Sequence, residues 1–375
     1  MSGQASADVI VVGGGIIGTT LAYELQKRNL QTVLLEQGQI GREATWATAG
    51  IIGPPTAHSL PPHRAKLAEL SEKRYAGLLD SIAADSGQET SFLNIGKVLV
   101  AFTEEEVEEA QARVTWQVNH GFEARWLERD EVHDVEPTIP DDALGAYFTP
   151  QGGGLTGHRL TEAVADAFRQ IGGEIREYTA ATRVLTEGDR VSGVETPDGS
   201  VHADTVVLAA GAWTSFLGPS VAHSIPVVPV KGQMIGVTPA SDGSRPQHVT
   251  GTVSGGYVVP RIDGTVAVGA TLEHNGFDKR TTARAFEHAI RLMAKVSPGL
   301  LDAQFSSAWA GLRPGTSDDS PIMGPVPGYE GLWVSTGHFR TGIQLAPGSA
   351  VLVADAIRSG SRDDLLAEFG LERFS

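Results

Sequence analysis

Four residues near the start of the chain have the types and spacing that bind a dinucleotide. Gly13, Gly15 and Gly18 form a GxGxxG pattern, and Glu36 closes the next apolar segment. In such a pattern the first glycine permits a tight turn, the second lets the backbone approach a pyrophosphate, and the third lets a helix pack on a strand. A carboxylate in the place of Glu36 can accept two hydrogen bonds from a ribose diol.

The sequence around these glycines supplies the elements that must position them. Residues 8–38 read as a strand, a glycine turn, a helix and a second strand. The helix N-terminus offers free N–H groups and a partial positive charge to phosphates. A lone GxGxxG is a weak signal, because 45 glycines in 375 residues form such patterns by chance. The strand–turn–helix context makes dinucleotide binding the favoured interpretation over a structural glycine turn.

Composition and charge exclude several classes of site and partner. At 375 residues the chain is long enough for two domains with full cores. The formal net charge is -16 and no basic run occurs, which disfavours nucleic acid and anionic membranes as partners. The chain has no cysteine, so disulfides, thiolate chemistry and cysteine-ligated metals are excluded. We predict no metal site.

The sequence gives no sign of secretion or of a membrane span. Residues 1–8 contain neither Lys nor Arg, and glycines interrupt the apolar run behind them. No window approaches the ~20 apolar residues of a spanning helix. We therefore expect a cytoplasmic protein without membrane contact, and the sequence leaves open whether identical chains associate.

Apolar spacing and capping residues predict helices in the middle of the chain. Residues 64–85 have apolar positions at helical spacing. Thr103 and Glu106 form a capping box for a helix that ends at Gly121. A further helix is expected near 282–297.

Alternating and apolar runs predict strands and hairpins. Residues 157–213 read as a helix, a strand, a hairpin turning at Asp198–Gly199 and a continuous apolar strand. Residues 225–237 and 256–272 read as antiparallel strands, the latter a hairpin around Asp263–Gly264.

These elements predict an α/β protein with two domains. The end of the chain again reads as a strand followed by a helix, as in the nucleotide fold. We predict a Rossmann-like, doubly wound nucleotide domain into which an antiparallel-sheet α+β substrate domain is inserted. The nucleotide domain is expected to comprise residues 1–85, 150–220 and 310–375, and the substrate domain residues 86–149 and 221–309.

Motifs along nearly the whole chain resemble one family. The matching segments are VVGGGIIG (11–18), Glu36, ATWATAGII (44–52), PVKGQ (229–233), GYVVPR (256–261), VGATLE (268–273), AGLRPGT (310–316) and GHFRTGIQLAPG (337–348). The chain resembles the FAD-dependent D-amino acid oxidase family, and within it the glycine oxidase branch linked to thiamine biosynthesis.

The resemblance implies FAD as the cofactor, and the absence of cysteine implies that no cysteine links it covalently. Residues that match the family's cofactor contacts lie in the glycine turn, the loop after Glu36, one strand near 178–184, and the segment after 337. They are Gly13, Gly15, Ile16, Ile17, Gly18, Glu36, Gln37, Ala44, Thr45, Ala49, Gly50, Ile51, Ala181, His338, Phe339, Arg340, Thr341, Gly342, Ile343 and Gln344. The amides of the last segment are expected to point at an anionic atom of the cofactor.

The resemblance also implies how a substrate carboxylate is bound. Arg313 resembles the arginine that pairs with the carboxylate, and Tyr257 resembles the phenol that donates a hydrogen bond to it. Arg340 matches a second arginine beside cofactor and substrate. A guanidinium suits this task because it offers a rigid fork of donors.

Two other residues invite catalytic interpretations that we do not adopt. Lys231 suggests oxygen activation, but a structural lysine is the favoured interpretation. His338 is expected to act through its backbone rather than as an acid or base.

The chain departs from the family pattern at two places. Gly255 and Gly256 stand where some relatives have bulkier residues, and Leu272 stands where a methionine can occur. We expect these residues to enlarge the pocket, so that small N-alkylglycines are accepted beside glycine.

The predicted function is oxidative deamination of glycine and small N-alkylglycines or D-amino acids. The α-carbon would pass hydride to N5 of FAD, giving an oxoacid, ammonia or an amine, and molecular oxygen would be reduced to hydrogen peroxide. One alternative is an FAD-dependent amino acid dehydrogenase that passes electrons to a quinone or a protein. Another is a redox-inactive nucleotide-binding partner protein.

Overall fold

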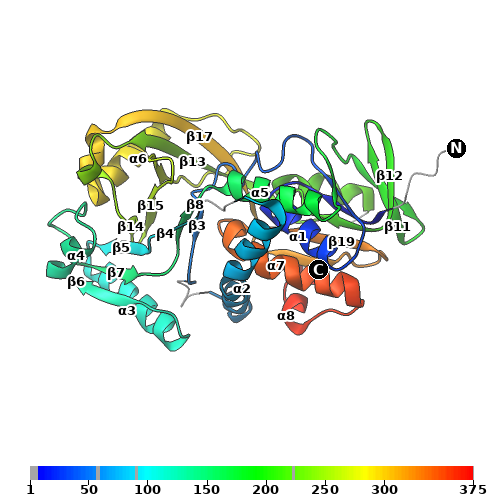
Figure 1. The fold of residues 1–375 in the computed structure, drawn as a ribbon, viewed down its shortest axis with the longest axis horizontal. Coiled ribbons are helices and arrows are strands. Elements are labelled where there is room, and N and C mark those ends of the chain that lie inside the picture. The colour runs from blue at the N-terminus through cyan, green and yellow to red at the C-terminus, as the bar shows by residue number, and fades with distance from the viewer. Residues whose placement is uncertain (1–6, 56–59, 89–91, 222–223, 375) are drawn as a thin grey trace.

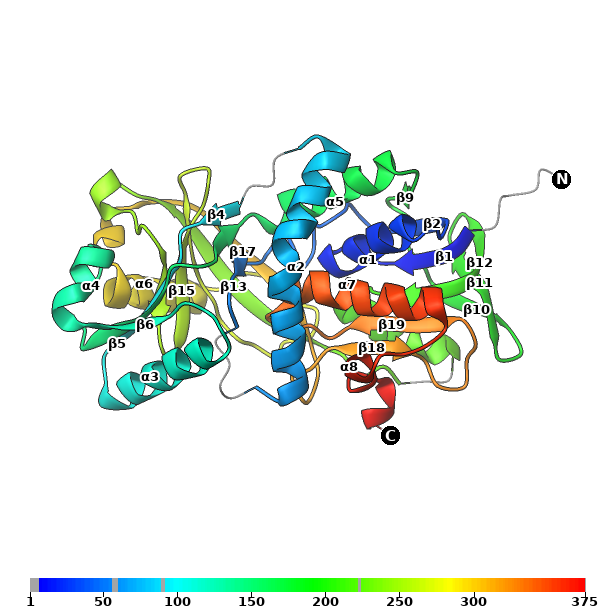
Figure 2. The ribbon, with the colours of Figure 1, turned by 60° about the horizontal axis from the view of Figure 1, so that its bottom comes forward.

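The computed structural model has two lobes, and the long helix α2 (Pro62–Ser86) lies between them (Figures 1 and 2). The structure describes residues 7–55, 60–88, 92–221 and 224–374. Residues 1–6, part of the segment on which the prediction of no secretion signal depends, lie outside the described residues. Within the described ranges, no helix has the length and apolar character needed to cross a bilayer.

A largely parallel sheet forms the centre of the lobe that holds the N-terminus. Its core runs β19-β12-β1-β2-β9, with every neighbour parallel. Antiparallel strands extend it at β10, β11 and β18. The bounds are β1 Ala7–Val12, β2 Thr32–Leu35, β9 Glu174–Arg176, β10 Arg183–Glu187, β11 Arg190–Thr196, β12 Gly199–Leu208, β18 Ile322–Pro325 and β19 Leu332–Thr336. The predicted doubly wound α/β class is confirmed.

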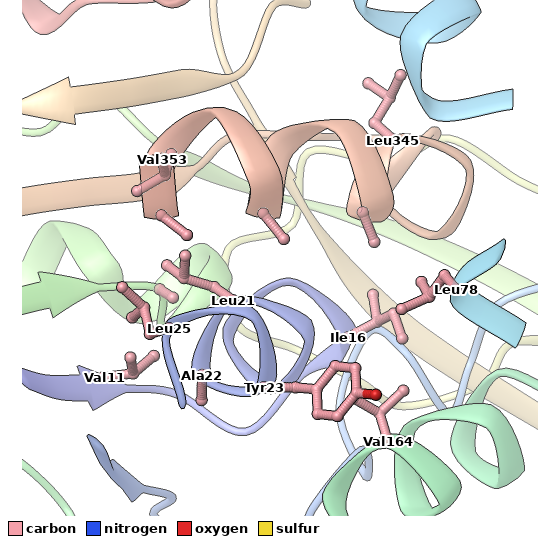
Figure 3. Close-up of a cluster of buried hydrophobic side chains, with 14 of the residues drawn as sticks. Val11, Ile16, Leu21, Ala22, Tyr23, Leu25, Leu78, Val164, Leu345 and Val353 are labelled. Carbon is pink, nitrogen blue, oxygen red and sulfur yellow. The ribbon is translucent and has the colours of Figure 1, made fainter. Parts of the chain in front are cut away.

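Helix α1 is buried under three other helices on one face of this sheet. Figure 3 shows Leu21 beside Val353 of α7, and Tyr23 beside Val164 of α5. All four side chains are fully buried, and each contributes about 1.5–3 kcal/mol relative to an exposed position. The helices of this lobe are α1 Ile16–Lys27, α2 Pro62–Ser86, α5 Gly157–Gln170, α7 Gly342–Ser359 and α8 Asp364–Ala367.

The second lobe is built on a mostly antiparallel sheet in the order β17-β13-β16-β15-β14-β5-β7-β6. The pairing of β14 with β5 is parallel. Helices α3 (Glu104–Asn119), α4 (Arg129–Val135) and α6 (Ala283–Val296) belong to this lobe. The strand bounds are β5 Lys97–Ala101, β6 Arg125–Glu128, β7 Gly145–Thr149, β13 Val228–Thr238, β14 Val249–Thr252, β15 Gly255–Pro260, β16 Val266–Gly269 and β17 Gln304–Gly315.

Strands β13 and β17 pair over their whole lengths and reach toward the first lobe. Their register runs from Thr238 opposite Gln304 to Val228 opposite Gly315. Strand β17 therefore crosses residue 310, where the predicted nucleotide domain resumes. The domain division itself stays a prediction.

A small sheet joins the two lobes. Strand β8 (Gly153–Leu155) lies between β3 (Ile51–Ile52) and β4 (Phe92–Asn94). The loop expected after Glu36 therefore leads into a short strand, because the backbone of Ile51 and Ile52 pairs with β8.

The predicted helices and hairpins of the middle of the chain are confirmed. Thr103 Oγ1 accepts the Glu106 amide at the start of α3, while the Glu106 carboxylate accepts the amide of Phe102. In a regular capping box the Glu106 carboxylate would accept the amide of Thr103, whereas here it accepts the amide of the preceding residue. Strands β11 and β12 turn at Asp198–Gly199, and β15 and β16 turn around Asp263–Gly264.

Candidate active site

A cavity of about 450 Å³ lies where the carboxyl ends of the parallel strands meet. Its lining includes Gly13 after β1, Glu36 after β2, Ala209 after β12 and His338 after β19. Parallel strands end at the same edge of a sheet, so four segments distant in sequence converge here. Ligands of open α/β sheets bind at this edge, and the volume falls in the ~300–1,000 Å³ range of small-molecule sites.

The glycine turn presents free amides to this cavity. The Gly13 amide donates to Leu35 O, and the Ile16 amide donates to Thr45 Oγ1. Within the described residues, the amides of Gly15 and Ile17 have no acceptor, and both residues line the cavity. These amides at the start of α1 can therefore donate to an anionic ligand such as a pyrophosphate.

Glu36 is held at the edge of the cavity by two amides. Its Oε2 accepts the Gly14 amide at 2.7 Å and its Oε1 accepts the Gly38 amide at 2.8 Å. Burial raises the pKa of Glu36, although these two bonds act in the opposite direction. The carboxylate lines the cavity and keeps acceptor positions for a ribose diol.

The N-terminus of a second helix, α7, also faces the cavity. Gly342, Ile343 and Gln344 line it, and their amides have no acceptor among the described residues. Two helix N-termini from opposite ends of the chain thus place partial positive charge at one cavity.

Helix α2 fixes this first turn of α7. Pro347 has no N–H, so it cannot donate to the carbonyl of Ile343, four residues earlier. Tyr75 of α2 donates its hydroxyl to that carbonyl at 3.0 Å. Ser71, one turn earlier, donates to Leu345 O and accepts the Gly348 amide.

His338 anchors the loop before α7. Its Nε2 lies 3.0 Å from Ser349 Oγ, and the side chain is buried. Burial lowers the pKa of His338 to about 3, so the imidazole is neutral at physiological pH. It therefore cannot act as a cationic acid toward a substrate.

The expectation for the amides of this loop is correct only in part. The Phe339 amide donates to Pro314 O, and the Thr341 amide donates to His338 O. Phe339 has φ 48, and this left-handed conformation turns the chain from β19 into α7. Among the described residues, the amides of His338 and Arg340 have no acceptor, like those of Gly342, Ile343 and Gln344 at the start of α7.

Arg313 and Tyr257, both on strands of the second lobe, also line the cavity. Arg313 lies near the end of β17, and Tyr257 is on β15. To the described residues, the Arg313 guanidinium makes one hydrogen bond, from Nη1 to Thr271 O at 3.1 Å. The Tyr257 hydroxyl makes none to them. Both groups therefore have donors left for an anionic ligand.

Arg340 lines the cavity but is solvent-exposed, with its guanidinium 4.9 Å from the ring centre of Phe339. The turn at Phe339 directs Arg340 to the rim.

Most of the residues predicted from sequence come together around this cavity. Gly18, Gly50 and Thr341 are not among its lining residues. Gly18 has a packing role, since a Cβ there would lie 1.9 Å from Gly13 O. The sequence did not single out several lining residues: Gln39, Arg42, Glu43, Thr48, Thr179, Thr182, Trp213, Phe216, Gly232 and Leu312.

The expected pocket enlargement at Gly255 and Gly256 is not supported. Neither glycine lines the cavity, nor does Leu272, which is half exposed. A Cβ at Gly256 would meet Leu292 of α6 at 2.9 Å, which lies in a separate hydrophobic cluster. Both glycines have positive φ, 132 and 78, so they serve the bulged turn between β14 and β15.

Comparison with known proteins decides the family. The family model described as FAD dependent oxidoreductase matches residues 8–356. The chain belongs to this family. A glycine oxidase of Pseudomonas aeruginosa is 36% identical over 351 residues, covering 93% of this chain and 94% of the relative. The crystal structure of glycine oxidase from Geobacillus kaustophilus superposes with a TM-score of 0.91 at 30% identity, covering 98% of this chain and 99% of that one. That of iminodiacetate oxidase from Chelativorans sp. BNC1 has a TM-score of 0.88 at 26% identity, covering 96% and 98%.

The protein is therefore an FAD-dependent oxidoreductase that acts on amines or amino acids. The described residues of the cavity suit the cofactor. The cavity provides free amides at two helix N-termini for its anionic parts, and a carboxylate for its ribose. FAD supplies the redox chemistry, and the chain supplies binding, orientation and electrostatics.

Proposed function

We propose that this enzyme oxidises glycine, small N-alkylglycines and small D-amino acids, and that molecular oxygen is the electron acceptor. The observation that carries the proposal is that Arg313 and Tyr257 both line the cavity, each with unused donors. A carboxylate bound to the Arg313 fork and the Tyr257 hydroxyl has its α-carbon oriented by three donors.

The free amides at the starts of α1 and α7 and the Glu36 carboxylate would hold FAD without a covalent link. FAD would supply the hydride acceptor for oxidation of the substrate α-carbon, and the imine product would hydrolyse to an oxoacid and ammonia or an amine. We expect no general base from the described residues that line the cavity. Among the described lining residues, Glu36 is committed to two amides, Glu43 forms an ion pair with Lys279 at 2.9 Å, and His338 is buried. The amine would lose its proton to water before oxidation.

The structural relative named iminodiacetate oxidase supports acceptance of N-substituted glycines. Iminodiacetate is a glycine with a carboxymethyl group on nitrogen. An apolar N-alkyl group that finds contact in the cavity could gain ~0.8 kcal/mol per carbon. Because Gly255 and Gly256 do not line the cavity, the room for such a group depends on the lining residues themselves.

Stopped-flow flavin reduction tests the proposal directly. The holoenzyme is mixed without oxygen with glycine, sarcosine, N-ethylglycine or D-alanine, and oxygen is added afterwards. We expect bleaching of the flavin band, followed by rapid return with release of peroxide. A reduced enzyme that is reoxidised by a quinone and not by oxygen would identify a dehydrogenase. No reduction by any small amino acid would refute the proposed substrate class.

Variants of Arg313 test the carboxylate site. Loss of a charge-assisted pair should cost about 3 kcal/mol, so Arg313→Ala should lower kcat/KM roughly a hundredfold while FAD stays bound. Arg291→Ala is the matched control, because Arg291 is exposed on α6 and its ion pair to a described residue is with Glu287, one turn earlier. Parental kcat/KM in Arg313→Ala would show that the carboxylate binds elsewhere.

A further inference from the structure

The position of the Arg313 guanidinium depends on a glycine of the neighbouring strand. Gly232 lies on β13 opposite Gly311, two residues from Arg313 along β17. A Cβ built at Gly232 would lie 2.2 Å from Nη2 of Arg313 and 2.4 Å from Nη1 and Cζ. Atoms cannot approach so closely, so any side chain at this position displaces the guanidinium. The clash involves only the far end of a flexible side chain, so the backbone can stay in place.

The second contact that orients the guanidinium comes from the carbonyl of Thr271, which accepts Nη1 at 3.1 Å. Thr271 is fixed against β13 by two bonds with Gln233. The Gln233 amide donates to Thr271 Oγ1 at 3.0 Å, and the Thr271 amide donates to Gln233 O at 3.3 Å. Thr271 Oγ1 in turn donates to Glu273 Oε1 at 2.6 Å.

Glu273 is held by Lys231 through both backbone and side chain. Their amides and carbonyls exchange two hydrogen bonds, at 2.9 and 3.0 Å. Lys231 Nζ lies 3.5 Å from Glu273 Oε2 and donates to Arg280 O at 2.7 Å. Burial acts to raise the pKa of Glu273, but bonds from Thr271 and Gln233 and the charge of Lys231 outweigh it, so the pKa is lowered and the carboxylate stays ionised.

Lys231 does not line the cavity, and its side chain is 1% exposed. Residues alternate between the two faces of a strand, so Lys231 and Gly232 serve Arg313 from opposite sides of β13. Gly232 leaves room on the cavity side, and Lys231 secures the 271–273 segment on the other side.

We infer that Gly232 and the Lys231–Glu273 ion pair are positioning residues for Arg313, which set the direction of its guanidinium fork toward the substrate carboxylate. The inference rests on the proposed function, because it requires that Arg313 bind that carboxylate. It assigns to the PVKGQ segment a task that neither the glycine nor the lysine could perform alone.

The first test compares Gly232→Ala with Gly236→Ala. Gly236 lies on the same strand, and a Cβ there would meet the hydroxyl ends of Ser307 and Ser306 at 2.7 and 3.0 Å, away from the cavity. We expect Gly232→Ala to raise the KM for glycine and the Kd for acetate at least tenfold. Acetate binding is measured by its perturbation of the flavin spectrum in the oxidised holoenzyme. Gly236→Ala should leave both constants within about twofold of the parent values.

A double-mutant cycle separates positioning from general damage. In an Arg313→Ala background, Gly232→Ala should have no further effect on acetate affinity, because no guanidinium remains to be displaced. An equal loss in both backgrounds would overturn the inference. If Arg313→Ala alone leaves acetate and glycine binding unchanged, the proposed function fails instead, and the two failures are distinguishable.

Glu273→Ala is an independent test of the inference, because this substitution adds no group to the cavity. It should raise the acetate Kd three- to tenfold in the parent background and leave it unchanged in the Arg313→Ala background. Glu273→Gln keeps an acceptor for Thr271 Oγ1 and should recover part of the affinity. Parental acetate affinity in Glu273→Ala, with FAD content unchanged, would refute the role of the ion pair.

Discussion

The hydroxyl of Tyr75 should stabilise the start of α7 because it replaces a bond that Pro347 cannot make. Tyr75→Phe leaves the buried Ile343 carbonyl without its partner at 3.0 Å. A buried acceptor that loses its partner costs about 1–3 kcal/mol. Opening of the first turns of α7 should become more favourable by this amount, which corresponds to a roughly 5- to 150-fold faster amide exchange.

Hydrogen exchange with mass spectrometry measures this opening locally, without assuming that the two lobes unfold together. The peptide covering 342–352 should exchange faster in Tyr75→Phe, while peptides of α5 stay unchanged. Pro347→Ala restores an N–H that can donate to Ile343 O. In that background Tyr75→Phe should cost at least ~1 kcal/mol less. The same acceleration in both backgrounds would show that the Tyr75 hydroxyl does not replace the hydrogen bond that Pro347 cannot make.

Three further predictions concern the cofactor site and one helix terminus. In the unfolded chain His338 has a pKa of about 6.5 and takes up a proton as the pH is lowered from 7.5 to 5.5. In the folded protein its pKa is about 3 and it stays neutral, so the free energy of unfolding decreases as the pH is lowered. The parent should therefore lose about 1.4 kcal/mol more than His338→Gln over this range in urea denaturation, and equal losses would contradict the buried neutral state. Glu36→Gln should weaken FAD binding about tenfold or more, measured by flavin fluorescence, because a single amide oxygen cannot serve both Gly14 and Gly38; an unchanged Kd would speak against this role. Thr103→Ala should destabilise α3 by about 0.5–2 kcal/mol, seen as faster exchange in its first turn only, since it removes the acceptor for the Glu106 amide.

The nucleotide-binding half of the site was predictable because its rules are local. Gly13, Gly15 and Gly18 are required by one turn, and Glu36 is required by the strand that follows. The resemblance to a known family added Arg313 and Tyr257, and the structure places both in the cavity wall. Their roles toward substrate stay predictions.

The other half depends on contacts between strands that no local pattern encodes. The need for glycine at 232 comes from a side chain that reaches over from β17, and Thr271 contributes a carbonyl rather than a side chain. The sequence also could not show that a side chain at position 256 would face α6 rather than the cavity, because this depends on how α6 packs against β15. Strands β5 and β7 were missed, since each is short and β5 pairs with the distant β14.

The order of strands in the parallel sheet brings the first-made and the last-made parts of the cofactor site together. Strand β12 lies between β1 and β19, and α7 covers the face of α1 that carries Leu21. A ribosome adds about 5–20 residues per second, so roughly 15–70 s separate the synthesis of α1 from that of α7. Throughout this interval α1 lacks one of its buried neighbours and the cavity lacks the wall formed by 338–344. The apolar face of α1 therefore stays partly uncovered during synthesis, and we expect the complete FAD site to form only after α7 has been made.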